Sequence, residues 1–418
     1  MYKNRNGALW NVLGSTMYGL NSFLMLALVS RVGTVEEAGY FGIAFTTAQL
    51  LYIVGLFGVP HYQMTDYTER FRFSTYAKAR VLSCILMLVC CGVSIALLGF
   101  SGIKRIYTVA LTILMLLNVV GELYQSLFFQ KNRLDLSGSA LFYRTLWPLL
   151  LFCAVGLLTK NILLAVTVQI AANLIITAYY AVRVAPQFAA NPSADRRAED
   201  TVTALVKECF PLAVSLFLMN IVINMSKYGI ELVGDDTVQG YYGMIFMPAQ
   251  VINLCSQFLF KPFLNQYSML LTQRKTADFF SLLKKQILLV GGLTLVCCTA
   301  AYFLGTPVLG FLYGKDLSQF AIALTLVVFG GGIYAGCQLF YYILVILRQQ
   351  RLIFWIYAGA AVLSVPLSLT LIGLWGILGA VLAFAATHLF IVLCYLLVIR
   401  HALRNQPDNR GNADANCY

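Results

Sequence analysis

The sequence predicts an all-α integral membrane protein with about twelve transmembrane helices in two pseudo-symmetric six-helix lobes around a central cavity. Three observations predict this fold class: the composition, the length of the apolar segments, and an internal repeat. Of the 418 residues, 60% are hydrophobic and only 11% are charged, and the mean hydropathy is +0.78. A water-soluble domain of this length needs more charged residues to cover its surface, whereas lipid replaces water around a membrane protein.

Twelve segments of roughly 18–25 residues are long and apolar enough to cross a bilayer as helices. The first is too long for the apolar core of a signal peptide, and no small-residue cleavage site follows it, so we expect it to remain as a span. The first six spans are predicted at residues 7–30, 38–58, 81–100, 106–129, 140–158 and 162–182. The second six are predicted at residues 209–228, 240–263, 286–305, 320–347, 352–373 and 377–399.

The basic residues lie mainly in the loops on one side of the membrane. If the N-terminus is cytoplasmic, 23 of the 29 Lys and Arg residues lie on that side. This bias follows the positive-inside rule, so both termini are predicted to be cytoplasmic, and it argues against nucleic acid as a partner despite the net charge of +12. The loop that carries Arg70, Arg72, Lys78 and Arg80 is expected to set the topology and to contact anionic lipid headgroups.

The two halves of the chain contain a repeated segment. Residues 32–42 (VGTVEEAGYFG) align without a gap with residues 233–243 (VGDDTVQGYYG). An even number of spans in each half makes the repeat parallel, with a pseudo-twofold axis along the membrane normal. A polar, Pro-containing segment lies between the halves. The predicted domains are an N-terminal lobe at 1–182, a cytoplasmic linker at 183–208, a C-terminal lobe at 209–400 and a disordered cytoplasmic tail at 401–418.

Polar residues recur at helical spacing within three of the predicted spans. Because polar groups inside a membrane are costly, such stripes favour a hydrated cavity between the lobes over interhelical hydrogen bonding in a dry bundle. The stripes consist of Asn220, Asn224, Lys227 and Glu231 in the seventh span, Asn11, Ser15, Tyr18 and Ser22 in the first, and Gln250, Asn253, Gln257 and Lys261 in the eighth.

Charged residues within the spans are candidates for binding an anionic substrate. Lys227 and Arg31 can hold a diphosphate if they line a cavity, or snorkel to the outer headgroups, which is favoured for Arg31. Arg144 and Glu122 either form a buried structural pair or act separately, and an unpaired Glu122 is the candidate for coupling to a proton or another cation. The candidate substrate-binding residues are Lys227, Asn220, Asn224, Gln250, Asn253, Arg144 and Arg31.

Helix-breaking residues predict hinges in the second half. Pro211 starts the seventh span, Pro248 interrupts the eighth, and Gly330-Gly331-Gly332 is expected to break the tenth. Each position removes or weakens backbone hydrogen bonds, so bending there costs little free energy.

The sequence contains no motif that predicts catalysis or metal binding. The cysteines lie mostly inside apolar segments, and no CxxC, zinc spacing, P-loop or nucleophile elbow occurs. Asp235-Asp236 is an acidic pair that can bind a metal in principle, but the equivalent Glu36-Glu37 indicates a repeated surface turn. The longest outer loop, residues 306–319, carries only Lys315 and Asp316 as charges. We therefore predict a transporter without catalytic residues, metal or cofactor.

Three segments resemble the seventh and eighth spans of the polysaccharide repeat-unit flippases in the MOP (multidrug/oligosaccharidyl-lipid/polysaccharide) exporter superfamily, in its capsule, exopolysaccharide and O-antigen branch. They are Phe210-Pro211, residues 224–228 (NMSKY) and residues 239–248 (QGYYGMIFMP). The resemblance implies a bacterial cell-membrane protein that moves undecaprenyl-diphosphate-linked oligosaccharide from the inner to the outer leaflet by alternating access. It also implies coupling to a proton or sodium gradient or to the membrane potential, and partners such as a polysaccharide polymerase and other assembly proteins.

Two alternatives remain open at the level of sequence. A drug or small-metabolite exporter of the same superfamily predicts a drug-resistance phenotype and no defect in surface polysaccharide. A membrane-embedded polysaccharide polymerase or lipid-linked glycosyltransferase is less favoured, because such enzymes need catalytic loops outside the bilayer.

Overall fold

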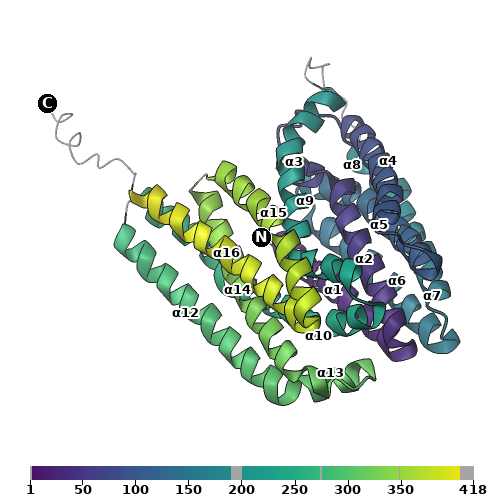
Figure 1. Ribbon diagram of the computed structural model, residues 1–418. Coiled ribbons are helices and arrows are strands. Elements are labelled where there is room, and N and C mark those ends of the chain that lie inside the picture. Colours follow the sequence, from purple (N-terminus) through teal and green to yellow (C-terminus); the bar gives the residue numbers. More distant parts are fainter. Residues whose placement is uncertain (1, 190–199, 274, 348, 405–418) are drawn as a thin grey trace. The chain divides into compact units, whose positions relative to one another are not determined.

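The computed structural model describes residues 2–189, 200–273, 275–347 and 349–404 (Figure 1). Within these residues, twelve helices are long and apolar enough to cross a membrane, which confirms the predicted all-α membrane fold class. The centre of the predicted linker and residues 405–418 of the predicted disordered tail lie outside the described residues.

The long helices match the predicted spans one for one. Most of them extend beyond the predicted limits, because a helix can continue into the headgroup region where charged side chains are tolerated. In the first half they are α1 (Tyr2–Val32), α2 (Val35–Leu56), α4 (Phe73–Leu97), α5 (Gly102–Gln130), α6 (Leu134–Thr159) and α7 (Ile162–Tyr179). In the second half they are α9 (Val202–Val233), α10 (Asp236–Phe260), α12 (Thr276–Ala300), α14 (Ala321–Ile346), α15 (Gln350–Trp375) and α16 (Ile377–Arg404).

In the described part of the chain, four short α-helices lie between the long ones. The segment at 306–319, predicted as an outer loop, begins with a helix, so the loop prediction is wrong for its first part. The short helices are α3 (Val59–Thr65), α8 (Pro186–Ala189), α11 (Leu264–Thr272) and α13 (Thr306–Tyr313).

The repeated segment encodes the start of a helix in each half. The Thr34 hydroxyl accepts a hydrogen bond from the Glu37 N–H at 3.0 Å at the start of α2. At the equivalent place before α10, the Asp235 carboxylate accepts from the Val238 N–H at 2.7 Å. Both side chains satisfy backbone N–H groups that lack a partner in the first helical turn. Asp235 thus lies in a repeated turn, as predicted, but its equivalent in the alignment is Thr34 and not an acidic residue.

The predicted break in the tenth span is wrong. Helix α14 runs without interruption through the three glycines. A Cβ atom added at Gly331 would lie 2.8 Å from the Ala249 Cα atom, and one added at Gly332 would lie 2.3 Å from the Thr294 hydroxyl oxygen. The glycines therefore let α14 pack closely against α10 and α12, as small residues do between membrane helices. Pro211 and Pro248 likewise lie within the continuous helices α9 and α10.

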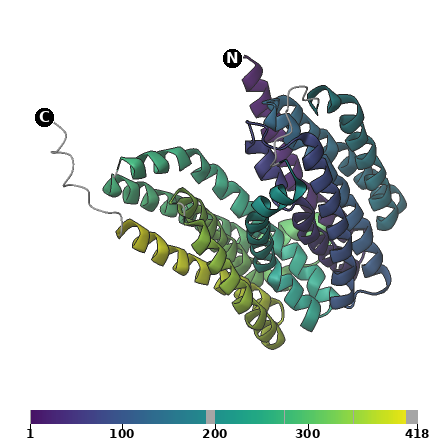
Figure 2. The same ribbon diagram turned by 90° about the horizontal axis from the view of Figure 1, so that it is seen from above.

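The chain divides into two compact units. The first contains Met1–Ile245 and Thr306–Gln319, and the second contains Phe246–Gly305 and Phe320–Tyr418. Within the first unit, α1 packs along α6 and α2 packs along α5, in the purple to blue bundle seen in Figures 1 and 2. Within the second, α16 packs against α14 and α15. The domain boundaries that the repeat suggests stay a prediction.

Candidate functional site

A buried ion pair lies in the first compact unit. Arg144 of α6 is 4% exposed, and its Nη2 atom lies 2.9 Å from Oε1 of Glu122 on α5. The guanidinium also donates to the Gln125 side-chain oxygen at 3.4 Å and to the Asn118 carbonyl at 3.3 Å. The sequence left open whether Arg144 and Glu122 pair, and the structure shows that they do. Their functional roles stay predictions.

A glycine on α5 makes room for the Arg144 guanidinium. A Cβ atom at Gly121 would lie 1.5 Å from the Arg144 Nη1 atom. An unpaired guanidinium inside a membrane protein is costly, so both this space and the Glu122 carboxylate are needed to hold Arg144 there. The sequence signal for this arrangement is the succession of Gly121 and Glu122, but the partner on another helix cannot be read from it.

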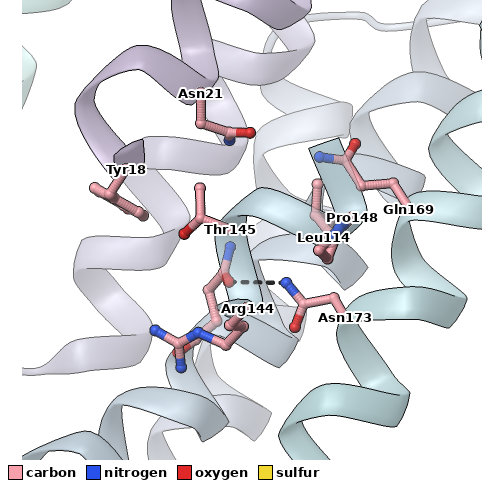
Figure 3. Close-up of a pocket in the computed structure, with 9 residues that line it drawn as sticks. Tyr18, Asn21, Leu114, Arg144, Thr145, Pro148, Gln169 and Asn173 are labelled. Carbon is pink, nitrogen blue, oxygen red and sulfur yellow. Dashed lines mark hydrogen bonds between the residues drawn. The ribbon is translucent and has the colours of Figure 1, made fainter. Parts of the chain in front are cut away.

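Next to this pair is a small polar pocket (Figure 3). Its volume is about 10 Å³, close to the space that one water molecule needs. The Asn173 side-chain nitrogen donates to the Asn118 side-chain oxygen at 3.0 Å, the dashed line in Figure 3. The pocket is lined by Tyr18 and Asn21 of α1, Leu114 and Asn118 of α5, Arg144, Thr145 and Pro148 of α6, and Gln169 and Asn173 of α7.

Three lining residues carry a buried polar atom that has no hydrogen-bond partner among the described residues. They are the Arg144 Nε–H donor and the side-chain oxygens of Asn21 and Gln169. A buried polar atom left without a partner costs about 1–3 kcal/mol. The pocket therefore has the space and the unpartnered polar atoms to hold one water molecule, which can bond to these groups.

The predicted polar stripe on α9 is present, but its amides bond within their own helix. The side chain of Asn220 donates to the Leu216 carbonyl at 3.2 Å, and that of Asn224 donates to the Asn220 carbonyl at 3.0 Å. Lys227 is part-buried and donates to the Thr46 hydroxyl of α2 at 3.4 Å. Of these three candidates, Lys227 is thus the one whose polar group reaches another helix.

The remaining candidates lie in other places. Arg31 is exposed, and its Nη1 atom donates to the Phe311 carbonyl of α13 at 3.1 Å. Gln250 and Asn253 lie on the part of α10 that belongs to the second compact unit. A cavity that they share with Lys227 stays a prediction, and the side chain of Gln257 lies outside the described residues.

The polar residues predicted on one face of the first span, now in α1, lie in two different environments. Tyr18 lines the polar pocket, whereas the Asn11 side chain donates to the Leu134 carbonyl of α6 at 3.0 Å. For Asn11, the interpretation as an interhelical hydrogen bond therefore applies.

Arg80 is a buried cation that the sequence interpretation missed. It was predicted in a basic loop at the headgroups, but it lies within α4 and is only 2% exposed. Its Nη1 atom donates to the Gly55 carbonyl at 2.7 Å and to the Leu56 carbonyl at 3.3 Å. Helix α2 ends there with Phe57 in the left-handed conformation (φ 50°), and a cation suits the unpaired carbonyls of a helix C-terminus.

Other residues of this basic segment bind the start of α9. Arg70 lies 2.8 Å from a Glu208 carboxylate oxygen, and Arg72 lies 3.5 Å from one of Asp200. Burial and a hydrogen bond with Glu208 raise the pKa of the neighbouring Tyr62, on the short helix α3, to about 12. Arg70 and Arg72 thus hold α9 against the first-half helices, a contact that the headgroup prediction did not include.

The sequence matches no protein-family model and no curated protein, but solved structures resemble the fold. An inward-facing multidrug resistance MATE family transporter of the MOP superfamily is 11% identical over 93% of this chain and 96% of that chain, with a TM-score of 0.71. The lipid II flippase MurJ in an inward closed conformation is 14% identical over 94% and 89%, with a TM-score of 0.67. The Vibrio cholerae MATE transporter VcmN in the bent form is 14% identical over 96% and 97%, with a TM-score of 0.58. The chain has the fold of MOP-superfamily transporters.

Proposed function

We propose that the protein is a flippase that moves undecaprenyl-diphosphate-linked oligosaccharide repeat units from the inner to the outer leaflet of a bacterial cell membrane. Transport occurs by alternating access and serves surface polysaccharide biosynthesis, with a polysaccharide polymerase and other assembly proteins as partners. The fold likeness to a lipid II flippase supports this function, as does the resemblance of the seventh and eighth spans to the polysaccharide branch.

The observation that carries the proposal is an excess of positive charge inside the spans of the first unit. Arg144 is balanced by Glu122. Arg80 bonds to backbone carbonyls and has no carboxylate within ion-pair distance in the part of the chain that the structure describes. Part-buried Lys227 adds a third basic group. Buried cations are costly in a membrane, and they suit a substrate that carries a diphosphate.

A drug or small-metabolite exporter is the second candidate, because a multidrug transporter is among the structural neighbours. The excess of buried positive charge disfavours a cationic drug as the substrate. Glu122 is the proposed coupling residue in either case. Since it is paired with Arg144, binding of a proton or a sodium ion there must first weaken that ion pair.

The test is deletion of the gene in its host, followed by measurement of undecaprenyl-linked repeat units and surface polysaccharide. We expect the lipid-linked units to accumulate and the polysaccharide to disappear. The wild-type gene is expected to return the lipid-linked units to their normal level and to restore the polysaccharide. Lys227→Ala at equal membrane abundance is expected to restore little, whereas Lys285→Ala, an exposed control on α12, restores both fully. Unchanged polysaccharide and lipid intermediates in the deletion strain would exclude the sugar substrate and leave the drug-exporter alternative.

A further inference from the structure

The two copies of the sequence repeat contact each other at the predicted outer ends of α2 and α10. A Cβ atom added at Gly39 would lie 1.9 Å from the Asp236 carbonyl oxygen, and one added at Gly240 would lie 2.1 Å from the Val35 carbonyl oxygen. In the alignment of the repeat, Val35 corresponds to Asp236 and Gly39 corresponds to Gly240. Each contact is therefore the symmetry equivalent of the other, and the pseudo-twofold axis passes between these two helix ends.

Only one glycine of each copy is required by this crossing. Gly42 and Gly243 are also repeated, but a Cβ atom at Gly42 would meet nothing within 4 Å. One at Gly243 would make an ordinary contact of 3.7 Å with a methyl group of Leu26. Gly39 and Gly240 are thus needed for a close approach of two backbones, and the other pair supplies matched controls on the same helices.

Three charged side chains join the halves beside the crossing. The Lys104 Nζ atom, at the start of α5, lies 2.7 Å from a Glu231 oxygen at the end of α9. It also lies 2.5 Å from an Asp236 oxygen at the start of α10. The side chains of Lys104 and Glu231 are only 14% and 6% exposed, so this pair is shielded from solvent and worth more than a surface pair, whereas the Asp236 side chain is 28% exposed.

A second attachment lies nearby, between α1 and the segment that follows α12. The Arg31 side chain donates to the Phe311 carbonyl at 3.1 Å, and the Lys315 side chain donates to the Gly33 carbonyl at 2.8 Å. Arg31 was predicted as a candidate for binding the substrate, but its guanidinium bonds to this segment. The contact belongs to the first unit, as do the helix crossing and the three charged side chains beside it.

We propose that the crossing of α2 and α10 at Gly39 and Gly240, fastened by Lys104, Glu231 and Asp236, is a closure that opens at the outer face during transport. The inference rests on the proposed function, because a substrate delivered to the outer leaflet needs an exit on that side. The contact consists mainly of backbone approach and charge pairs, and a methyl group of Val35 lies 3.0 Å from a Cβ atom added at Gly240. Water and headgroups can solvate these groups once the ends separate, so opening costs less free energy than parting an apolar core.

The first experiment locks the closure in cells. Cysteines replace Lys104 and Asp236, and a membrane-impermeant bis-thiosulfonate of matching length is added from outside; it forms a reducible disulfide with each thiol and releases sulfinate. We expect cross-linking to stop delivery of the lipid-linked units and a reductant to restore it. The control is the pair Glu36→Cys and Tyr40→Cys, which lies within α2 alone and carries the same native cysteines. Undiminished delivery by the cross-linked Lys104–Asp236 pair would overturn the proposal.

The second experiment needs no transport. A reporter cysteine at Thr46, which is 2% exposed and lies further along α2, is labelled from outside with an impermeant maleimide. We expect labelling to be severalfold faster with Gly39→Ala, which cannot close, than with Gly42→Ala. Lys104→Gln gives the same comparison if Gly39→Ala fails to insert. Equal labelling in all variants would overturn the closure. A labelling difference without any delivery of the lipid-linked units would leave the closure intact and reject the proposed function.

Discussion

The ion pair between Arg144 and Glu122 allows a sharp test of the buried electrostatics. Glu122→Gln removes the only carboxylate in ion-pair contact with Arg144 among the described residues, and the guanidinium stays charged. The Arg144 side chain is 5% exposed, so bulk water cannot replace the lost carboxylate, and the adjoining pocket has room for only about one water molecule. An unpaired charge in such a place costs about 3 kcal/mol of unfolding free energy, by both soluble-protein and membrane-insertion scales. We expect Glu122→Gln to destabilise the protein by that amount.

The decisive variant removes both charges. Arg144→Met in the Glu122→Gln background leaves no unpaired ion, and a neutral replacement of a buried pair is often close to wild type in stability. We therefore expect the double variant to lie within about 1 kcal/mol of wild type and to be more stable than Glu122→Gln alone. The assay is equilibrium unfolding in mixed micelles, followed by circular dichroism, with Arg144→Met completing the cycle. Additive losses, with the double variant less stable than either single one, would refute this account of the pair.

Three further substitutions test packing and capping, each with a thermal-unfolding measurement in detergent. Gly121→Ala collides with the guanidinium next to it and is expected to destabilise by about 2 kcal/mol, whereas Gly92→Ala, with nothing within 4 Å, does not. Arg80→Leu removes the guanidinium donor from the Gly55 and Leu56 carbonyls and leaves Gly55 with the Ser83 hydroxyl, and it is expected to cost about 2 kcal/mol; full stability would contradict the capping role. Gly331→Val is expected to disrupt the packing of α14, while Gly336→Val, which faces open space, leaves the melting temperature within a few degrees.

The number and positions of the membrane helices could be predicted from the sequence because each span carries its own signal. A run of apolar residues of membrane-spanning length predicts a helix without knowledge of its neighbours. The same local reasoning failed at Gly330-Gly331-Gly332, since glycine weakens an isolated helix but permits close packing between helices. Which effect wins depends on Ala249 and Thr294, residues that only the folded chain brings into contact.

The candidate site was predictable only in part, for a similar reason. The polar spacing on α9 identified one helix face, and the buried charges Arg144 and Glu122 were visible as anomalies within apolar runs. Their pairing at 2.9 Å depends on how α5 and α6 pack, which the sequence does not state. Arg80 was assigned to a loop because hydropathy places the start of the span after it. The helix in fact begins at Phe73. Arg80 therefore lies inside the helix, although it lies just before the apolar segment that predicted the span.

The repeat itself explains why two short segments remain alike in halves that otherwise differ. Thr34 and Asp235 each cap a helix, and Gly39 and Gly240 each admit the backbone of the other helix. These demands concern backbone geometry at the symmetry axis, so both copies must meet them. The ion cluster of Lys104, Glu231 and Asp236 has no such symmetry, because Asp236 corresponds in the alignment to Val35, a residue without charge. The crossing therefore sets where the two halves meet, while a single cluster around Lys104 sets how firmly they are held. These are separate properties of one contact, and substitutions can change the second without altering the first.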